Sequence, residues 1–130
     1  MIVLDPSAAL EWLLQTAAGR EIENRIYLHN ESLHAPHLMD VEVVHALRRL
    51  VRESQVSICR ADEAIVDFMG LRVTRYPHVP FLARIWQLRH KLSAYDAAYA
   101  VLAEELGATL ITHDARLASA VSSSVEVELY

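Results

Sequence analysis

Glycine and cysteine are both scarce in this sequence of 130 residues. Its three glycines, Gly19, Gly70 and Gly107, stand too far apart to build a Walker loop or a GxGxxG turn, which excludes nucleotide binding through a glycine-rich loop. The single cysteine, Cys59, has no partner for an internal disulfide, so we expect a reducing compartment, the cytoplasm. Cys59 itself is predicted to be a small buried apolar residue.

Long apolar runs and an excess of positive charge are absent as well. No run approaches the roughly 18 residues of a membrane span, and the first ten residues carry Asp5 where a secretion signal carries basic residues. We therefore expect neither export nor membrane insertion. The formal net charge is −5, which argues against a protein that binds nucleic acid through bulk positive charge. It does not exclude acids concentrated in a metal site.

The length and the hydrophobic content of 53% predict one domain, residues 1–130, with a single core. Apolar segments of strand type alternate along the chain with amphipathic segments of helix type. This order predicts an α/β fold, a three-layer sandwich with a mostly parallel sheet and helices on both faces. We expect strands at 1–4, 32–36, 71–76, 109–112 and 125–129, and helices near 7–18, 20–28, 37–51, 59–68, 81–92, 94–106 and 115–121.

Apolar residues in two of these helices bear on packing. In the first helix, Trp12 and Leu13 belong either to the core of the monomer or to a symmetric contact between two copies, and the sequence leaves both open. In the helix near 37–51, apolar residues recur at steps of three and four, which predicts one buried stripe. The stripe consists of Leu38, Val41, Val44, Leu47 and Val51.

Four acids fall near the ends of predicted elements. Asp5 directly follows the first strand, and Asp114 follows the fourth. Asp96 lies in the first turn of the helix before that fourth strand, and Glu42 lies early in the helix after the second. Taken singly, the aspartates are better explained as helix caps and Glu42 as a solvated residue. Together they favour one site, because ligands of open parallel sheets bind beyond the carboxyl ends of the strands.

Acids gathered in this way need a compensating charge. Two unit charges about 4 Å apart repel by roughly 4 kcal/mol at an effective dielectric constant near 20. Protonation is one way to relieve this repulsion. A cluster of oxygen ligands more naturally holds Mg²⁺ or Mn²⁺, which is the cofactor that we expect.

Four segments of the chain, in this order and at these separations, resemble the PIN-domain ribonucleases. More narrowly, the chain resembles the VapC-type toxins of bacterial toxin–antitoxin pairs. The resemblance runs from the first residues to about Ala120, and it rests on DPSA (5–8), DVEV (40–43), SAYDAAY (93–99) and THDARL (112–117).

The resemblance implies a parallel sheet between helices, a homodimer, and hydrolysis of RNA phosphodiester bonds that depends on Mg²⁺ or Mn²⁺ and leaves 5′-phosphate and 3′-hydroxyl ends. It also implies a cognate antitoxin protein that inserts a segment toward the site. The catalytic and metal-binding residues that it implies are Asp5, Glu42, Asp96 and Asp114, with Ser7 and Thr112 as supporting hydroxyls.

An acidic protein still needs cations to hold RNA, and eleven of its twelve basic residues are arginines, which bind phosphate through a bidentate fork. Arg116 is the best single candidate, because a helix start places it two residues beyond Asp114. For the other clusters, an ordinary solvated helix face is as good an interpretation as RNA contact. These clusters are Arg48, Arg49 and Arg52, and Arg84, Arg89, His90 and Lys91.

Histidines and tyrosines offer weaker signals. A zinc site at His34 and His37 is rejected, because Pro36 interrupts the segment and helical ligand pairs need a spacing of four residues. The role of His113, beside an acid, stays open. Tyr95 and Tyr99 are four residues apart, which is more typical of packing than of stacking on bases.

Two other classes of protein fit part of the sequence. A receiver-like signalling module also binds Mg²⁺ in an acidic pocket, but it needs a lysine after a late strand, whereas the only lysine, Lys91, precedes a helix. A catalytically silent interaction domain is the other alternative, and it is the one that predicts no binding of Mn²⁺.

Overall fold

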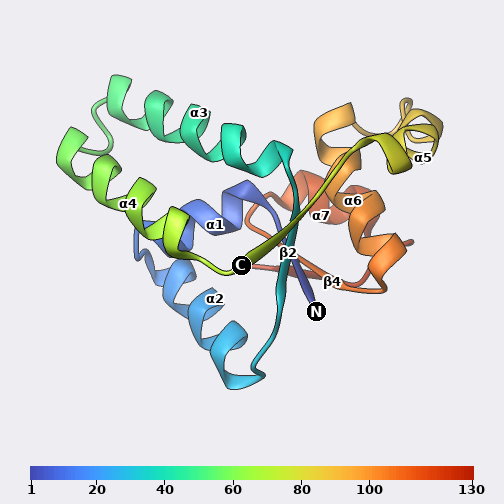
Figure 1. Cartoon of the computed structure of the whole chain (residues 1–130), viewed down its shortest axis with the longest axis horizontal. Helices are drawn as coiled ribbons and strands as arrows, with labels where there is room; N and C mark the ends of the chain where they lie inside the picture. Colours follow the sequence, from blue (N-terminus) through green and yellow to red (C-terminus); the bar gives the residue numbers. More distant parts are fainter.

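The fold is organised around five parallel strands. The computed structural model describes residues 1–130 (Figure 1). The strand order in the sheet is β3-β2-β1-β4-β5, and every neighbouring pair is parallel. The predicted α/β fold is therefore confirmed, with a sheet that is wholly parallel. The strands are Ile2–Leu4 (β1), Leu33–Pro36 (β2), Val73–Tyr76 (β3), Thr109–Thr112 (β4) and Val127–Leu129 (β5).

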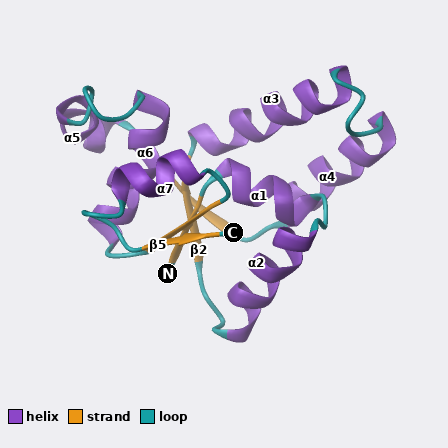
Figure 2. Cartoon of the chain, turned by 180° about the vertical axis from the view of Figure 1, so that it is seen from behind, coloured by secondary structure: helices purple, strands orange, loops and turns teal.

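Helices cover both faces of the sheet, as Figures 1 and 2 show. From β1 the chain steps outward through β2 to β3, and it then crosses back to add β4 and β5 on the other side of β1. Because crossovers between parallel strands are right-handed, the two directions put their helices on opposite faces. One face carries α1 (Pro6–Leu13), α2 (Ala17–Leu28), α3 (Leu38–Arg52) and α4 (Ile58–Gly70). The other carries a 3₁₀ turn (Val79–Phe81), α5 (Leu82–Gln87), α6 (Ala94–Leu106) and α7 (Ala115–Val121).

The centre of the core is formed by β1, β4 and α6. Every residue of β1 is buried, as expected for a parallel strand that is covered on both faces. In α6 the whole run Ala97–Ala103 is buried, so this helix is enclosed by protein around its circumference. Ser93 caps its first turn, and Gly107 ends it in the left-handed conformation (φ 59°). The enclosed helix is a rigid support for the polar residues of its first turns.

Two predicted helices are shorter in the structure. The first ends at Leu13, because Gln15 adopts a positive φ of 55° and Thr16 begins α2 by accepting a hydrogen bond from the amide of Gly19. The helix predicted over 81–92 divides into the 3₁₀ turn and α5, followed by turns that lead to the cap of α6 at Ser93. The other predicted elements are confirmed to within a few residues.

Three predictions of burial are resolved by the packing. Trp12 and Leu13 are buried in the core of the monomer, so they do not form a contact between copies. The prediction that Cys59 is buried is wrong. Cys59 lies in the first turn of α4, and that helix buries the face formed by Ala61, Ala64 and Phe68 instead.

The stripe predicted for α3 is partly wrong. Val41 and Val44 are exposed, at 65% and 52%, while α3 buries Met39, Val43 and Leu47. The buried residues recur at four-residue steps and contact the neighbouring helices and β2, so α3 packs on a face rotated from the predicted one. In addition, no helix of the structure is both long enough and apolar enough to cross a membrane.

The close packing of α1 on α2 can be tested at Gly19. A Cβ atom added there would lie 1.9 Å from the carbonyl oxygen of Glu11, so Gly19→Ala must push the two helices apart. We expect the free energy of unfolding, measured by urea denaturation, to fall by about 1–3 kcal/mol. Gly70→Ala is the matched control, because nothing lies within 4 Å of its added Cβ, and it should leave stability unchanged or slightly higher. A Gly19→Ala protein as stable as its parent would contradict this packing.

Candidate active site

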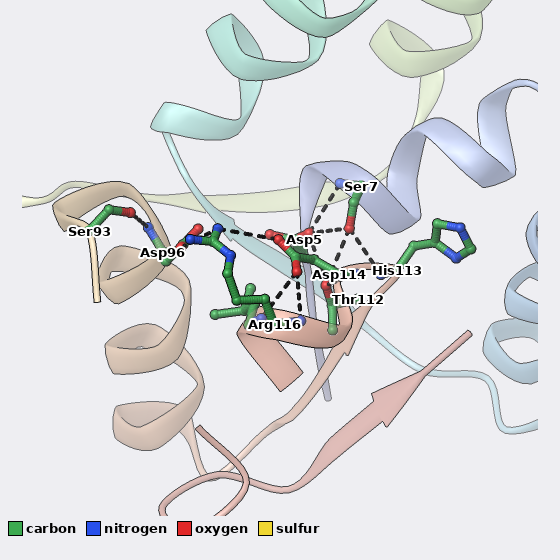
Figure 3. A network of polar contacts seen from close by, with 9 residues as sticks. Asp5, Ser7, Ser93, Asp96, Thr112, His113, Asp114 and Arg116 are labelled. Carbon is green, nitrogen blue, oxygen red and sulfur yellow. Dashed lines mark hydrogen bonds and ion pairs between the residues drawn. The ribbon is translucent and has the colours of Figure 1, made fainter. Parts of the chain in front are cut away.

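The candidate site lies where the direction of strand addition reverses. β1 and β4 are neighbours, but the chain leaves their carboxyl ends toward opposite faces of the sheet. Such a point is the usual ligand crevice of an open parallel sheet. Asp5 follows β1 and Asp114 follows β4 by one residue, so the structure brings these two acids to the same crevice (Figure 3).

Asp5 is the most deeply placed of the four acids, with 6% of its surface exposed. Its carboxylate accepts hydrogen bonds from the hydroxyl of Ser7, from the amide of Ser7 (3.1 Å) and from the hydroxyl of Thr112 (3.1 Å). Asp5 also caps α1, as the simpler interpretation of the sequence predicted. Burial raises the pKa of its carboxyl above the ordinary value, although these hydrogen bonds act in the opposite direction. A nearby cation would stabilise the ionised form of this carboxyl.

Ser7 and Thr112 join the two turns that form the crevice. Their hydroxyl oxygens are 3.2 Å apart. The Ser7 hydroxyl also accepts a hydrogen bond from the amide of His113 (2.9 Å), and the Thr112 hydroxyl accepts one from the amide of Asp114 (3.0 Å). The start of α1 and the end of β4 are thus fixed to each other by side chains. This arrangement supports the expectation that both hydroxyls assist the site.

Glu42 reaches the crevice from α3 and is half-buried. Its carboxylate accepts a hydrogen bond from the hydroxyl of Tyr99, which is 1% exposed on α6. Burial raises the pKa of the Glu42 carboxyl, and the charges of Asp5 and Asp96 raise it further, against the effect of the Tyr99 hydroxyl. The four-residue spacing from Tyr95 predicts packing for Tyr99 and does not reveal this contact with Glu42. The available signal was its position three residues after Asp96 on the same helix.

Arg116 joins the remaining two acids. Its guanidinium lies 3.2 Å from the carboxylate of Asp96 and 3.5 Å from that of Asp114 (Figure 3). Asp114 also caps α7, accepting hydrogen bonds from the amides of Arg116 (2.8 Å) and Leu117 (3.2 Å). Burial acts to raise the pKa of Asp114, but these amides and the Arg116 charge outweigh it and hold that pKa below its ordinary value. Arg116 therefore lies at the crevice, as its position in the sequence suggested.

The donor set of the crevice suits a hard divalent cation, because all four acids offer carboxylate oxygens and a cation would offset the cost of burying the charges of Asp5 and Glu42. In this conformation, however, no three Asp, Glu, His or Cys side chains stand together as a metal cage. Each carboxylate has an internal partner instead: hydroxyls for Asp5, a phenol for Glu42, and a guanidinium for Asp96 and Asp114. The carboxylate oxygens are suitable ligands for a divalent ion. In this conformation, however, the guanidinium of Arg116 takes the place of such an ion between Asp96 and Asp114.

The histidines do not take part in this donor set. His34 is buried, and its two ring nitrogens lie 2.9 Å from the hydroxyls of Ser32 and Tyr76, which is the core-edge role that the sequence favoured over zinc. The ring of His113 contacts the carbonyl oxygen of Tyr130, away from the four acids. The contribution of His113 is its backbone amide, which donates to Ser7.

Most other basic residues are engaged elsewhere. Arg84 forms an ion pair with Glu104 (2.9 Å), and the Arg89 guanidinium lies over the ring of Trp86 at 4.8 Å. Arg49, on the exposed side of α3, lines a cavity next to Glu42. The cluster on α3 therefore contributes an arginine beside Glu42.

Comparison with known proteins identifies the family that shares this fold. Residues 2–121 match the family model of the PIN domain. Ribonuclease VapC12 of Mycobacterium tuberculosis is 44% identical over 129 residues, which cover 99% of this chain and 98% of that protein. VapC ribonuclease Mb0985 of Mycobacterium bovis is 44% identical over 117 residues, covering 90% and 88%. The crystal structure of PAE2754 from Pyrobaculum aerophilum has a TM-score of 0.70 at 25% identity, covering 96% of this chain and 87% of the other.

The chain belongs to the PIN-domain family, since the family model spans nearly all of it. Within that family it belongs to the VapC-type group, because its relatives of that group align over almost their whole length. The resemblance noted in the sequence is thereby confirmed. The receiver-like alternative is wrong.

The raised pKa of Glu42 predicts a dependence of stability on pH. Because the pKa in the folded protein lies above that of the unfolded chain, the carboxyl favours folding most at low pH, and this contribution is lost as the pH rises through the folded pKa. Glu42→Gln is uncharged and still accepts the Tyr99 hydrogen bond. Without divalent metal, we expect it to raise the melting temperature at pH 8 by about 2–5 °C, a gain that shrinks to nothing below about pH 4.

Thermal denaturation across this pH range measures the difference. Glu126→Gln removes a carboxylate from an exposed position and is the control for net charge. An equal gain in both variants would show that burial and the neighbouring charges do not raise the pKa of Glu42.

Proposed function

We propose that this protein is a divalent-metal-dependent endoribonuclease that acts as the toxin of a toxin–antitoxin pair. The observation that carries the proposal is the convergence of Asp5, Glu42, Asp96 and Asp114 on the crevice between β1 and β4 of a VapC-type PIN fold. Mg²⁺ or Mn²⁺ is the ion that an all-carboxylate donor set would hold.

In this proposal the acids divide the work of the site. Asp5, Asp96 and Asp114 would hold the ion directly or through water, and Glu42 would either hold it or orient the attacking water. When bound, a divalent ion lowers the pKa of its water and neutralises charge that develops on the phosphate. Tyr99 fixes the carboxylate of Glu42 through its hydroxyl. Ser7 and Thr112 keep Asp5 oriented and hold the two turns together.

Arg116 would change partners during the reaction. In the structure its guanidinium supplies the positive charge between Asp96 and Asp114. Its side chain is 77% exposed, so these ion pairs are weak and easily exchanged. With the acids neutralised by a bound ion, the Arg116 guanidinium would be free to bind a phosphate of the RNA, for which its forked geometry is suited.

The partners follow from the same proposal. The substrate is RNA, whose cleavage would leave 5′-phosphate and 3′-hydroxyl ends and would take place in the cytoplasm. A cognate antitoxin would insert a segment toward the crevice and offer it a cation. We also propose that residues 1–130 form one domain and that two copies form a homodimer. Exposed apolar side chains on α4, Ile58, Val66 and Met69, are available for such a contact.

Asp96→Asn tests the catalytic assignment. We expect it to abolish cleavage of tRNA, rRNA and mRNA fragments in the presence of Mg²⁺ or Mn²⁺, and EDTA should abolish cleavage by the parent. The same variant should raise the melting temperature of the metal-free protein, because it removes one of the repelling charges. Asp67→Asn is the control, since Asp67 is exposed near the end of α4 and should be dispensable. Cleavage by Asp96→Asn at the parental rate would refute the role of Asp96.

Arg116→Gln tests the exchange of partners. Without the internal cation, we expect Mn²⁺, titrated calorimetrically, to bind about two- to fivefold more tightly, which is the range of a weak surface ion pair. RNA should bind less tightly, because a phosphate ligand is lost. Arg72→Gln removes an equal charge from an exposed residue before β3 and controls for the net field. If Arg116→Gln moved both affinities in the same direction, the exchange would be ruled out.

A further inference from the structure

A cavity of about 660 Å³ adjoins the acidic crevice and has no role in the mechanism above. It is bounded by the first turns of α1 and α6 and by most of the length of α3. Leu10, Leu38 and Val41 give it an apolar wall, and Glu42 is shared between the cavity and the crevice. Tyr95, His45 and Arg49 complete its lining.

We propose that this cavity is a subsite for one nucleoside of single-stranded RNA next to the phosphodiester that is cleaved, with Tyr95 as its stacking platform and Arg49 as its cationic contact. The inference rests on the proposed ribonuclease function and adds to it the part of the substrate that the cavity holds.

The first argument is continuity. Ser7 and Glu42 line the cavity and also contribute hydrogen-bonding groups to the acidic crevice. A phosphate held at the acids therefore has one of its flanking nucleosides at the opening of the cavity. An apolar wall with polar groups at its margin suits a nucleobase, which has apolar faces and hydrogen-bonding edges.

The second argument is the difference between two tyrosines on α6. Tyr99 is 1% exposed and its hydroxyl donates to Glu42, whereas Tyr95, one helical turn earlier, is 60% exposed and its hydroxyl has no hydrogen bond. Its ring borders a cavity instead of packing in the core. An aromatic ring at the mouth of a groove is the usual platform on which single-stranded nucleic acids stack their bases.

The third argument is charge. Arg49 and His45 line the cavity from α3, one turn apart, and neither forms an ion pair or a hydrogen bond with another side chain. The Arg49 guanidinium is thus free to bind a phosphate or a base edge. Arg116 lies among the acids on α7. A strand of RNA across the acids would therefore meet an arginine at the cavity and another at the crevice.

A single strand fits this surface better than a duplex does. The bases of an RNA helix are stacked inside it, whereas those of single strands and loops can turn outward into a pocket. The only acid that lines the cavity is Glu42, which the proposed mechanism already uses. The aromatic and cationic margin therefore matches RNA, and a protein segment in the cavity is the alternative that the experiment must separate.

The experiment measures RNA binding apart from cleavage. The Asp96→Asn protein is titrated into a short fluorescein-labelled single-stranded RNA of mixed sequence with Mn²⁺ present, and fluorescence anisotropy gives Kd. Introducing Tyr95→Ala into the Asp96→Asn protein should weaken its binding of this RNA by about 5- to 150-fold, which is the range that alanine substitution gives for one stacked base. Tyr95→Phe keeps the ring and should bind within about twofold of its parent.

Two further variants sharpen the test. Tyr27→Ala is the control, because Tyr27 is 68% exposed on α2 and does not line the cavity, and it should leave Kd unchanged. Arg49→Gln should weaken RNA binding and reduce its dependence on salt, since one phosphate contact is lost. Arg49 is exposed, so this variant also tests the subsite if Tyr95→Ala proves unstable.

The outcomes are distinct. Equal Kd values for Tyr95→Ala and Tyr27→Ala, or no RNA binding by the Asp96→Asn protein, would overturn the inference. Unchanged RNA binding with lost binding of the purified antitoxin would assign the cavity to a protein partner and would also overturn it. In the cleaving protein, Tyr95→Ala should raise KM much more than it lowers kcat. If the parent cleaves RNA but Tyr95→Ala leaves KM unchanged, only the subsite fails, whereas a parent that cleaves no RNA refutes the proposed function itself.

Discussion

Repulsion among carboxylates at the crevice between β1 and β4 is the constraint on which the site depends. The fold meets it with a different partner for each acid: hydroxyls at Asp5, a phenol at Glu42, and one guanidinium between Asp96 and Asp114. Hydroxyl contacts orient a carboxylate without cancelling its charge, which is why burial still raises the pKa values of Asp5 and Glu42. Arg116 supplies opposite charge to Asp96 and Asp114, and it does so from an exposed position. The negative charge of the crevice is therefore offset only in part by its own side chains, which is consistent with the proposed role of a divalent cation.

The topology explains how acids so distant in sequence come to lie close enough to interact electrostatically. The strand order places β1 beside β4, so the turns after both strands lie side by side, and the hydroxyls of Ser7 and Thr112 connect them. The other two acids arrive on helices from opposite faces, Glu42 on α3 and Asp96 on α6. Tyr99 bridges those helices by donating from α6 to Glu42 on α3. Both helical layers and the carboxyl ends of the central strands thus contribute to the geometry of the site.

Much of this was accessible from the sequence because it depends on local signals. Apolar segments and caps located the strands and most helices, and Asp5 and Asp114 stand at strand ends whatever the details of packing. The face that α3 buries was not accessible, since several apolar faces compete on one helix and only the neighbouring helices decide, which left Val41 exposed. The Tyr99 contact with Glu42 spans 57 residues and depends on the relative position of two helices. The spacing of Tyr99 from Asp96 places both on one side of α6, but no local pattern identifies Glu42 as the partner.

The same rotation of α3 that contradicted the expected stripe has a consequence for recognition. With Val43 facing inward, Val41 and Arg49 are left on the outer side of the helix, where they line a cavity beside Glu42 instead of filling the core. On α6, the enclosed position of Tyr99 similarly leaves Tyr95 at the rim one turn earlier. Helix α3 thus carries Glu42 at the acidic crevice and Arg49 at the cavity, and α6 carries Tyr99 beside Glu42 and Tyr95 at the cavity. In the proposed subsite, the residues that contact substrate and those that set the acid geometry lie on different turns of the same helices, so substitutions at the rim would change affinity for RNA without moving the carboxylates.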